Sequence, residues 1–168
     1  MSAEIIMDKY QFLNAEFAHK DFTIELNKDN MPAVGGLDEN SYNRFLDYSD
    51  YFKLIKYDNK FIGFMIALLP NRPYDSVNYK WFEKNYKSFI YIDRIVISLK
   101  YQNKGFGNYF YDDLKNNFRD NNFMACEVNI VPKNEISMKF HKKYGFEEVG
   151  QQSTENGKKL VSLQLLSL

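Results

Sequence analysis

The stretch FIYIDRIVIS-LKYQNKGFG-NYFYDDLKNNF, residues 89–118, places an apolar run, a glycine-containing turn and an amphipathic run one after another. Residues 89–98 are rich in the β-branched and aromatic side chains that favour a buried strand. Gly105 and Gly107 allow the backbone to bend tightly after this strand. Apolar residues then recur at helical spacing, at Phe106, Phe110, Leu114 and Phe118. The stretch therefore predicts a strand, a turn and a helix in direct succession.

The turn between this strand and this helix suits an anion. Backbone N–H groups at a helix start have no partner inside the helix and lie at the positive end of its dipole. Glycines let those groups come close to a phosphate. Neither a P-loop nor a dinucleotide fingerprint fits, since Tyr109 and Phe110 follow Gly107 where the fingerprint needs a third glycine. The glycines alone also fit a turn that merely begins a helix, so both interpretations stay open.

Outside this stretch the chain alternates helices and strands. The predicted elements are a possible strand at 3–7, a helix within 8–26, a helix after Asp38, a hairpin over 51–69 with its turn at Asn59, a helical segment over 79–86, a strand at 123–131, a helix from Asn134 to Gly145, and strands at 146–151 and 158–166 with a turn at 155–157. The strand at 123–131 follows the helix of residues 106–118, and a strand–helix–strand unit implies a parallel pair. We therefore predict an α/β fold with one mixed sheet.

The 168 residues suggest a single domain over 1–168, and charge and cysteine content limit its partners. The 22 basic residues equal the 22 acidic ones, which argues against an electrostatic grip on nucleic acid. Cys126 is the single cysteine and cannot form an internal disulfide, so a reducing compartment is expected. No apolar stretch approaches the roughly 20 residues of a membrane span, and the N-terminus lacks a signal-peptide pattern. We expect a cytoplasmic protein without membrane contact.

Residues 102–107, QNKGFG, match the pattern Q/R-x-x-G-x-G/A and resemble the acetyl-CoA loop of the GNAT N-acetyltransferase superfamily. The surroundings extend the resemblance over nearly the whole chain. The family pairs the loop with a later helix of the form N-x-x-A/S-x-x-x-Y-x-x-x-G-F, and Asn134, Ser137 and the Gly145-Phe146 pair fall at that spacing. The resemblance implies a mostly antiparallel central sheet with one splayed parallel strand pair, flanked by about four helices.

The resemblance also implies a reaction: an acetyl group moves from acetyl-CoA to a primary amine of a small molecule by direct attack on the thioester. It calls for no metal and leaves room for a homodimer. The residues implied to contact CoA are Ile95, Val96, Ile97, Gln102, Asn103, Lys104, Gly105, Phe106, Gly107, Asn108, Asn134 and Ser137. Asn134 fits the N-cap of its helix equally well. The same fold can bind acyl-CoA without turning it over, as a sensor or structural module, and this alternative stays open.

Two carboxylates are candidates for the group that takes the amine's proton or binds its ammonium form. Asp93 shares the period-2 face of its predicted strand with Ile95, and Glu127 lies on the next strand. Asp93 could instead form a salt bridge with Arg94. Cys126 points away from Glu127 on an ideal strand and is expected to be buried packing.

His141 stands where the family often has a tyrosine, four residues before Gly145. The resemblance makes it the candidate that protonates or hydrogen-bonds the departing CoA sulfur. It could also be a neutral hydrogen-bond donor or the base. The structural alternative is a histidine on the exposed side of a helix, beside Lys142 and Lys143. Tyr144 is expected to pack.

Two segments occupy the places where this fold usually builds its acceptor site. They are NMPAVGGL at 30–37 and NRPYDSVNYKWF at 71–82. Tyr74, Tyr79 and Trp81 could form an aromatic wall there, or the second segment could simply pack over the sheet. The sequence does not identify the amine.

Overall fold

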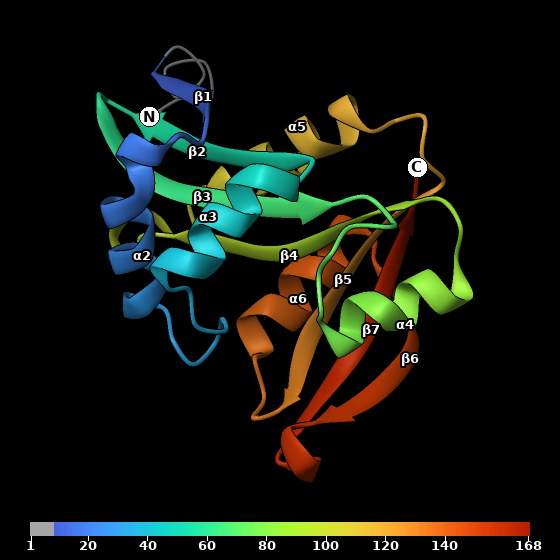
Figure 1. Cartoon of the computed structure of the whole chain (residues 1–168). Helices are drawn as coiled ribbons and strands as arrows, with labels where there is room; N and C mark the ends of the chain where they lie inside the picture. Colours follow the sequence, from blue (N-terminus) through green and yellow to red (C-terminus); the bar gives the residue numbers. More distant parts are fainter. Residues whose placement is uncertain (1–8) are drawn as a thin grey trace. The chain divides into compact units, whose positions relative to one another are not determined.

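The structure is a computed structural model that describes residues 9–168. Its seven strands form one mixed sheet in the order β1-β2-β3-β4-β5-β7-β6 (Figure 1), and β4 with β5 is the parallel pair. The strands are β1 (Tyr10–Asn14), β2 (Tyr51–Tyr57), β3 (Lys60–Leu68), β4 (Phe89–Ile97), β5 (Phe123–Val131), β6 (Glu147–Thr154) and β7 (Lys159–Ser167). The α-helices are α2 (Lys20–Asp29), α3 (Glu39–Tyr48), α4 (Val77–Asn85), α5 (Phe106–Asn117) and α6 (Glu135–Tyr144). The predicted α/β fold with a mixed sheet is confirmed.

The described residues fall into two compact units. Unit 1 contains the described residues up to Ala67 together with Arg94–Phe110, and unit 2 contains Leu68–Asp93 with Tyr111–Leu168. The chain passes from one unit to the other at three points, near the end of β3, within β4 and within α5. Each unit is described by itself.

In unit 1, β1, β2 and β3 pair antiparallel, and α2 and α3 lie on one face of these strands (Figure 1). The predicted hairpin over 51–69 is confirmed, and its turn has positive φ at Asp58 (47°) and Asn59 (61°). Asp38 caps α3 as predicted, because its carboxylate accepts a hydrogen bond from the Ser41 amide at 2.8 Å. Tyr42 of α3 is fully buried.

The helix predicted within 8–26 is only partly correct, since Tyr10–Asn14 is a strand and α2 begins at Lys20. Contacts distant in sequence favour the strand. Tyr10 stacks on Tyr109 with ring centroids 4.7 Å apart, and Phe12 lies 5.0 Å from Phe110. The strand predicted at 3–7 lies outside the described residues.

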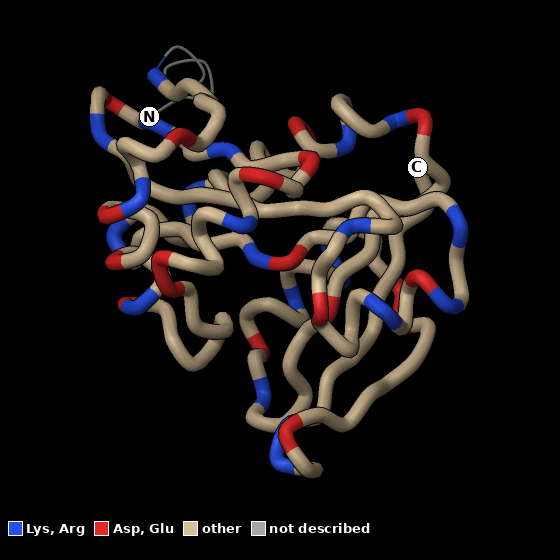
Figure 2. The backbone as a smooth tube through the Cα atoms, viewed as in Figure 1, with Lys and Arg blue, Asp and Glu red and all other residues tan. Residues whose placement is uncertain are grey.

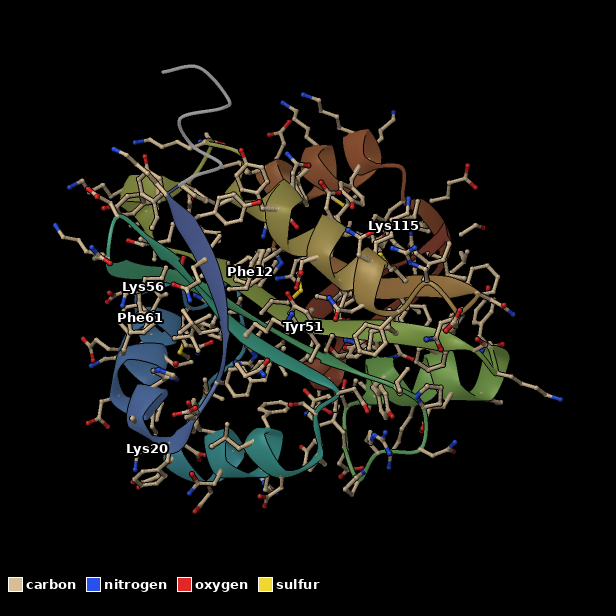
Figure 3. The ribbon with its side chains drawn as sticks, turned by 90° about the horizontal axis from the view of Figure 1, so that it is seen from above. Phe12, Lys20, Tyr51, Lys56, Phe61 and Lys115 are labelled. Atoms are coloured by element: carbon tan, nitrogen blue, oxygen red, sulfur yellow. The ribbon has the colours of Figure 1, made fainter. Side chains whose placement is uncertain are left out.

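Lysines of β2 lie over aromatic rings in unit 1. The Lys53 ammonium is 5.0 Å from the ring centroid of Tyr51 and 5.9 Å from that of Phe12. The Lys56 ammonium is 5.3 Å from the ring centroid of Phe61, and Figure 3 labels these two residues. Cation–π attraction of this kind holds lysine stems against a half-buried sheet surface. Figure 2 shows basic and acidic residues interspersed along both units.

In unit 2, β7 lies between β5 and β6 and pairs antiparallel with both. α4 covers one face of these strands, with Trp81 against the site of Gly150 on β6. α6 covers the other face, where the Gln164 amide contacts Met138. The helix predicted from Asn134 to Gly145 is confirmed with both caps: the Asn134 side chain accepts from the Ser137 amide at 3.2 Å, and Gly145 has a φ of 116°.

Candidate active site

The turn after β4 is shaped by its backbone in unit 1. The side-chain amide of Gln102 donates to the Ile97 carbonyl at 2.9 Å, which holds the turn against the end of the strand. Asn103 and Gly105 have positive φ values of 58° and 90°. The Tyr109 amide donates to the Gly105 carbonyl at 3.2 Å, so Gly105 is the residue from which α5 begins. The amides of the first turn of α5 therefore face out of the helix, as an anion site requires.

Two lysines add positive charge to this turn. The Lys100 and Lys104 ammonium groups each lie 5.7 Å from the centroid of the Tyr101 ring. Both lysines are exposed. A pyrophosphate at the start of α5 would gain from their charge as well as from the helix dipole.

The end of β4 is packed closely against β3 in unit 1. A Cβ at Gly63 would lie 2.6 Å from the Val96 carbonyl oxygen and 2.7 Å from the Ile97 side chain. The Ser98 amide donates to the Ile62 carbonyl at 2.8 Å. Val96 is buried, whereas Ile95 and Ile97 are half-buried. Backbone pairing of residues 95–97 with a pantetheine arm stays a prediction.

In unit 2, the pairing of β4 with β5 is short. The parallel register joins Phe89 to Phe123, Ile90 to Met124 and Tyr91 to Ala125, and Ile92 does not continue it. Residues opposite one another in a sheet share a face, and the face repeats every second residue. Tyr91, Asp93, Ala125 and Glu127 therefore lie on one face, at the point where the pairing ends.

On that face each carboxylate accepts a hydrogen bond from a tyrosine. The Tyr91 hydroxyl donates to Oε2 of Glu127 at 2.6 Å, and the Tyr74 hydroxyl donates to Oδ1 of Asp93. Tyr91 is fully buried, whereas Asp93 and Glu127 keep partial exposure. The structure thus brings together the two carboxylates that the sequence singled out separately.

The Glu127 carboxyl has a raised pKa. The pKa of this carboxyl is raised from 4.5 to about 7, mainly by burial and also by the nearby charge of Asp93. Hydrogen bonds from Tyr91 and Asn78 oppose these effects and lower the pKa, as Lys159 does to a smaller extent. A carboxyl that titrates near neutrality can take a proton from an ammonium group and release it again.

The aromatic wall predicted in the segment 71–82 forms in part. Tyr74 and Tyr79 lie in contact, with ring centroids 5.6 Å apart, and Tyr79 is 5.4 Å from Tyr91. Trp81 instead packs on Phe82 and toward β6. Two of the three predicted aromatic residues are therefore near the carboxylates of unit 2.

The segment 30–37 is held by Arg94 within unit 1. One guanidinium nitrogen, Nη1, donates to Oδ1 of Asn27 at 2.9 Å and to the carbonyls of Gly35 and Gly36 at 3.0 and 3.3 Å. The Asn27 amide also donates to the Gly35 carbonyl at 3.0 Å. These contacts shape the wall of a surface pocket of about 420 Å³. Its lining residues are Ile24, Asn27, Lys28, Met31, Gly36, Leu37, Asp38 and Ser41.

His141 is buried, at 4% exposure, so the alternative of a histidine on the exposed side of α6 is wrong. Its Nδ1 lies 2.7 Å from the Ser137 carbonyl and its Nε2 lies 2.6 Å from the Tyr111 hydroxyl. A carbonyl only accepts, so Nδ1 carries the proton and Nε2 accepts from Tyr111. Burial lowers the pKa of the imidazole, which favours this neutral form. The lone pair of Nε2 is therefore engaged by Tyr111.

Two further expectations concern α6 and β5. Cys126 is buried, as expected, and burial raises the pKa of its thiol well above the ordinary value. Tyr144 packs on Phe140 and also donates a hydrogen bond to Asp112 at 2.6 Å. Asn134 acts as an N-cap, and its contact with CoA stays a prediction.

Several residues of the site were missed at the level of sequence. Tyr91 lies two residues before Asp93, so the period-2 pattern could have placed it on the carboxylate face. Asn78, which bonds Glu127, and Tyr111, which bonds His141, had no comparable signal, because nothing in the sequence shows which side chains meet across elements.

No three His, Cys, Asp or Glu side chains among residues 9–168 are grouped so that they could hold a metal ion. No helix within the same residues has the length and apolar character needed to cross a membrane.

The comparisons with known proteins point in one direction. A sequence model described as the acetyltransferase (GNAT) family matches residues 15–146, while no curated protein matches in sequence. Ard1 from Thermoplasma volcanium has a similar structure, with a TM-score of 0.77 at 11% identity over 95% of this chain and 98% of that one.

Two further solved structures have the same fold. Naa50 of Arabidopsis thaliana, in complex with the bisubstrate analogue CoA-Ac-MVNAL, has a TM-score of 0.72 at 15% identity, over 95% of this chain and 99% of that one. The ribosomal-protein-S18-alanine N-acetyltransferase from Escherichia coli has a TM-score of 0.69 at 13% identity, over 94% and 93%. At these identities the likeness concerns the fold.

Proposed function

The chain belongs to the acetyltransferase (GNAT) family, and on this premise we propose that it transfers an acetyl group from acetyl-CoA to a primary amine of a small molecule. The observation that carries the proposal is the Glu127 carboxylate, which titrates near neutrality and lies on one face with Asp93. An amine is a nucleophile only after it loses its proton, and its ordinary pKa is about 10. A carboxylate beside the amine can accept that proton.

In this proposal Glu127 takes the proton of the amine, directly or through a water molecule, and Asp93 holds the ammonium form before the proton leaves. Asp93 is better suited to bind the ammonium group, because the Tyr74 hydroxyl fixes the position of its carboxylate. Glu127 is the better base because its pKa of about 7 matches the working pH. Much of the remaining rate comes from holding the amine against the thioester.

We assign acetyl-CoA binding to the turn at residues 102–107 and the start of α5. The positive φ of Gly105 and the first amides of α5 support this assignment, as do the charges of Lys100 and Lys104. The thioester supplies the acetyl group, and these residues hold and orient its carrier. A reducing, cytoplasmic setting suits the single buried thiol of Cys126.

We also assign His141 a role toward the leaving sulfur of CoA. A thiol leaves readily as thiolate, at a pKa of about 8.5, so an acid speeds the step without being essential. Because the neutral His141 ring accepts a hydrogen bond from Tyr111 at Nε2, in this proposal Nε2 takes up a proton from water before it donates that proton to the departing thiolate.

The test is a thiol-release assay with acetyl-CoA and a library of amines that includes small amines and peptides with free N-termini. We expect turnover with at least one small primary amine and a matching mass gain on the amine. Binding of acetyl-CoA by calorimetry without turnover of any library member would favour the alternative, a non-catalytic acyl-CoA-binding module.

A further inference from the structure

We propose that Tyr91, Asn78 and Gln152 are positioning residues that hold the Glu127 carboxylate in its ionised, proton-accepting form. The three come from β4, α4 and β6, and they surround a carboxylate on β5. The inference rests on the proposed function, in which Glu127 takes the proton of the amine.

Tyr91 is a permanent donor to Glu127. Its hydroxyl lies 2.6 Å from Oε2, and its ring is fully buried between Tyr79 and Phe82, with centroid distances of 5.4 and 5.8 Å. Burial raises the pKa of the phenol well above its ordinary value of 10. The hydroxyl therefore keeps its proton throughout the working range, and its hydrogen bond to Glu127 is stronger when the carboxylate is ionised than when it is protonated.

Gln152 decides which end of the Asn78 amide meets Glu127. The Gln152 Nε2 group donates to Oδ1 of Asn78 at 2.8 Å. Because the oxygen of Asn78 is engaged there, its NH₂ group is the end that donates to the Glu127 carboxylate. Asn78 itself is fixed in the first turn of α4, which the Ser76 hydroxyl caps by accepting from the Tyr79 amide at 3.3 Å.

Glu127 is thus under opposed influences from each element packed around it. Burial and the charge of Asp93 on β4 favour the neutral acid, while Tyr91 on β4, Asn78 on α4 and Lys159 on β7 favour the carboxylate. Tyr111 on α5 and Cys126 on β5 also interact with Glu127, and burial keeps the proton on each. Removal of a donor leaves the opposing influences unbalanced, so the carboxyl holds its proton to higher pH.

The experiment titrates the Glu127 carboxyl carbon by NMR in protein labelled with ¹³C-glutamate, with the signal assigned from Glu127→Gln. Tyr91→Phe removes one oxygen and keeps the packed ring. We expect it to raise the titration midpoint by about one pH unit, because the ionised carboxylate loses a charge-assisted hydrogen bond. Asn78→Ala should act in the same direction.

Gln152→Ala should give a smaller rise than Asn78→Ala, because Asn78 remains but is free to turn its oxygen toward the carboxylate. The matched control is Tyr86→Phe, whose ring packs on Phe123 at 5.4 Å and which should leave the midpoint unchanged. An unchanged midpoint in both Tyr91→Phe and Asn78→Ala would overturn the inference.

The fall of the catalytic rate at low pH, the acid limb of the pH–rate profile, separates this inference from the proposed function. If Glu127 is the base, the limb moves with the NMR midpoint in each variant, and the rate of Tyr91→Phe recovers above pH 8 or so. A midpoint that moves while the limb stays in place supports the positioning role and removes Glu127 as the base.

Discussion

The turn at 102–107 and the carboxylate cluster around Glu127 are built in different ways. The turn uses six consecutive residues, and its chemistry lies in the backbone: the positive φ of Gly105 and the first amides of α5. The cluster uses side chains from β4, α4, β5 and β6, and 36 residues separate Tyr91 from its partner Glu127. A backbone site can be recognised in a short sequence pattern, whereas a site of side chains depends on strand register and packing.

The largest expected effect breaks the backbone site. Gly105→Val places a β-branched side chain at a φ of 90°, where L-residues are strained, and blocks the approach of a pyrophosphate. Loss of charged hydrogen bonds worth about 2–3 kcal/mol should weaken acetyl-CoA binding about 100-fold in calorimetry. The control is Gly36→Ala, where a Cβ meets nothing within 4 Å. Wild-type affinity in a folded Gly105→Val variant would show that the loop assignment is wrong.

The second effect is the pH dependence that the side-chain cluster gives to stability. Glu127 has a pKa of about 7 in the folded protein, raised from 4.5, so the folded state binds more protons between these values. Its contribution to stability is complete below pH 4.5 or so and is lost as pH rises through about 7, by up to about 3 kcal/mol.

Urea unfolding of the wild type and Glu127→Gln at pH 5 and pH 8 measures this contribution. The wild type should lose more stability than Glu127→Gln between the two pH values. Glu147→Gln, at an exposed position on β6, should follow the wild type. Parallel losses in the wild type and Glu127→Gln would show that the carboxyl titrates as an ordinary glutamate.

The third effect concerns Arg94, whose side chain holds the segment 30–37 of unit 1 in place. Arg94→Lys keeps the charge but loses the planar group whose Nη1 binds Asn27, Gly35 and Gly36. The free energy of unfolding should fall by about 1–2 kcal/mol in urea titrations. Arg119→Lys, on the exposed surface, should change it by less than about 0.5 kcal/mol. Equal effects would mean that the Arg94 contacts contribute nothing specific.

The smallest effect is expected at His141. His141→Ala should lower kcat about tenfold and leave acetyl-CoA binding intact, while His141→Tyr should restore part of the rate and move the pH profile upward. Tyr111→Phe removes the hydrogen bond to Nε2 of His141 and leaves the imidazole in place. This variant separates the part that His141 plays in the reaction from its part in packing with Tyr111. A rate that survives His141→Ala across the pH range would assign the histidine to packing with Tyr111 alone.

The sequence predicted the elements whose signals are local. The strand–turn–helix of 89–118, the hairpin turn at Asn59 and both caps of α6 follow from backbone preferences of single residues, and the structure confirms them. The strand β1 was predicted as part of a helix, because its pairing with β2 and its stacking on Tyr109 involve distant residues.

The site divides along the same line. Asp93 and Glu127 were singled out by strand position, yet their joint placement depends on a parallel pairing that stops at Tyr91 and Ala125. The spacing of α6 places His141 beside the apolar stripe of Phe140 and Tyr144, which favours the inward side chain that the structure shows, but it does not indicate the contact with Tyr111. The contacts of Asn78 and Gln152 arise only after α4 and β6 have packed.

The most direct test of the account is the pH dependence of kcat/KM with an accepted amine, for the wild type, Glu127→Gln and Asp93→Asn. The account predicts an acid limb near pH 7 in the wild type, set by Glu127. Glu127→Gln should lose that limb and fall about 100-fold in rate. Asp93→Asn should keep the limb at lower pH, because loss of the Asp93 charge lowers the pKa of Glu127. Full kcat/KM in both variants would contradict the account, since neither carboxylate would then act on the amine.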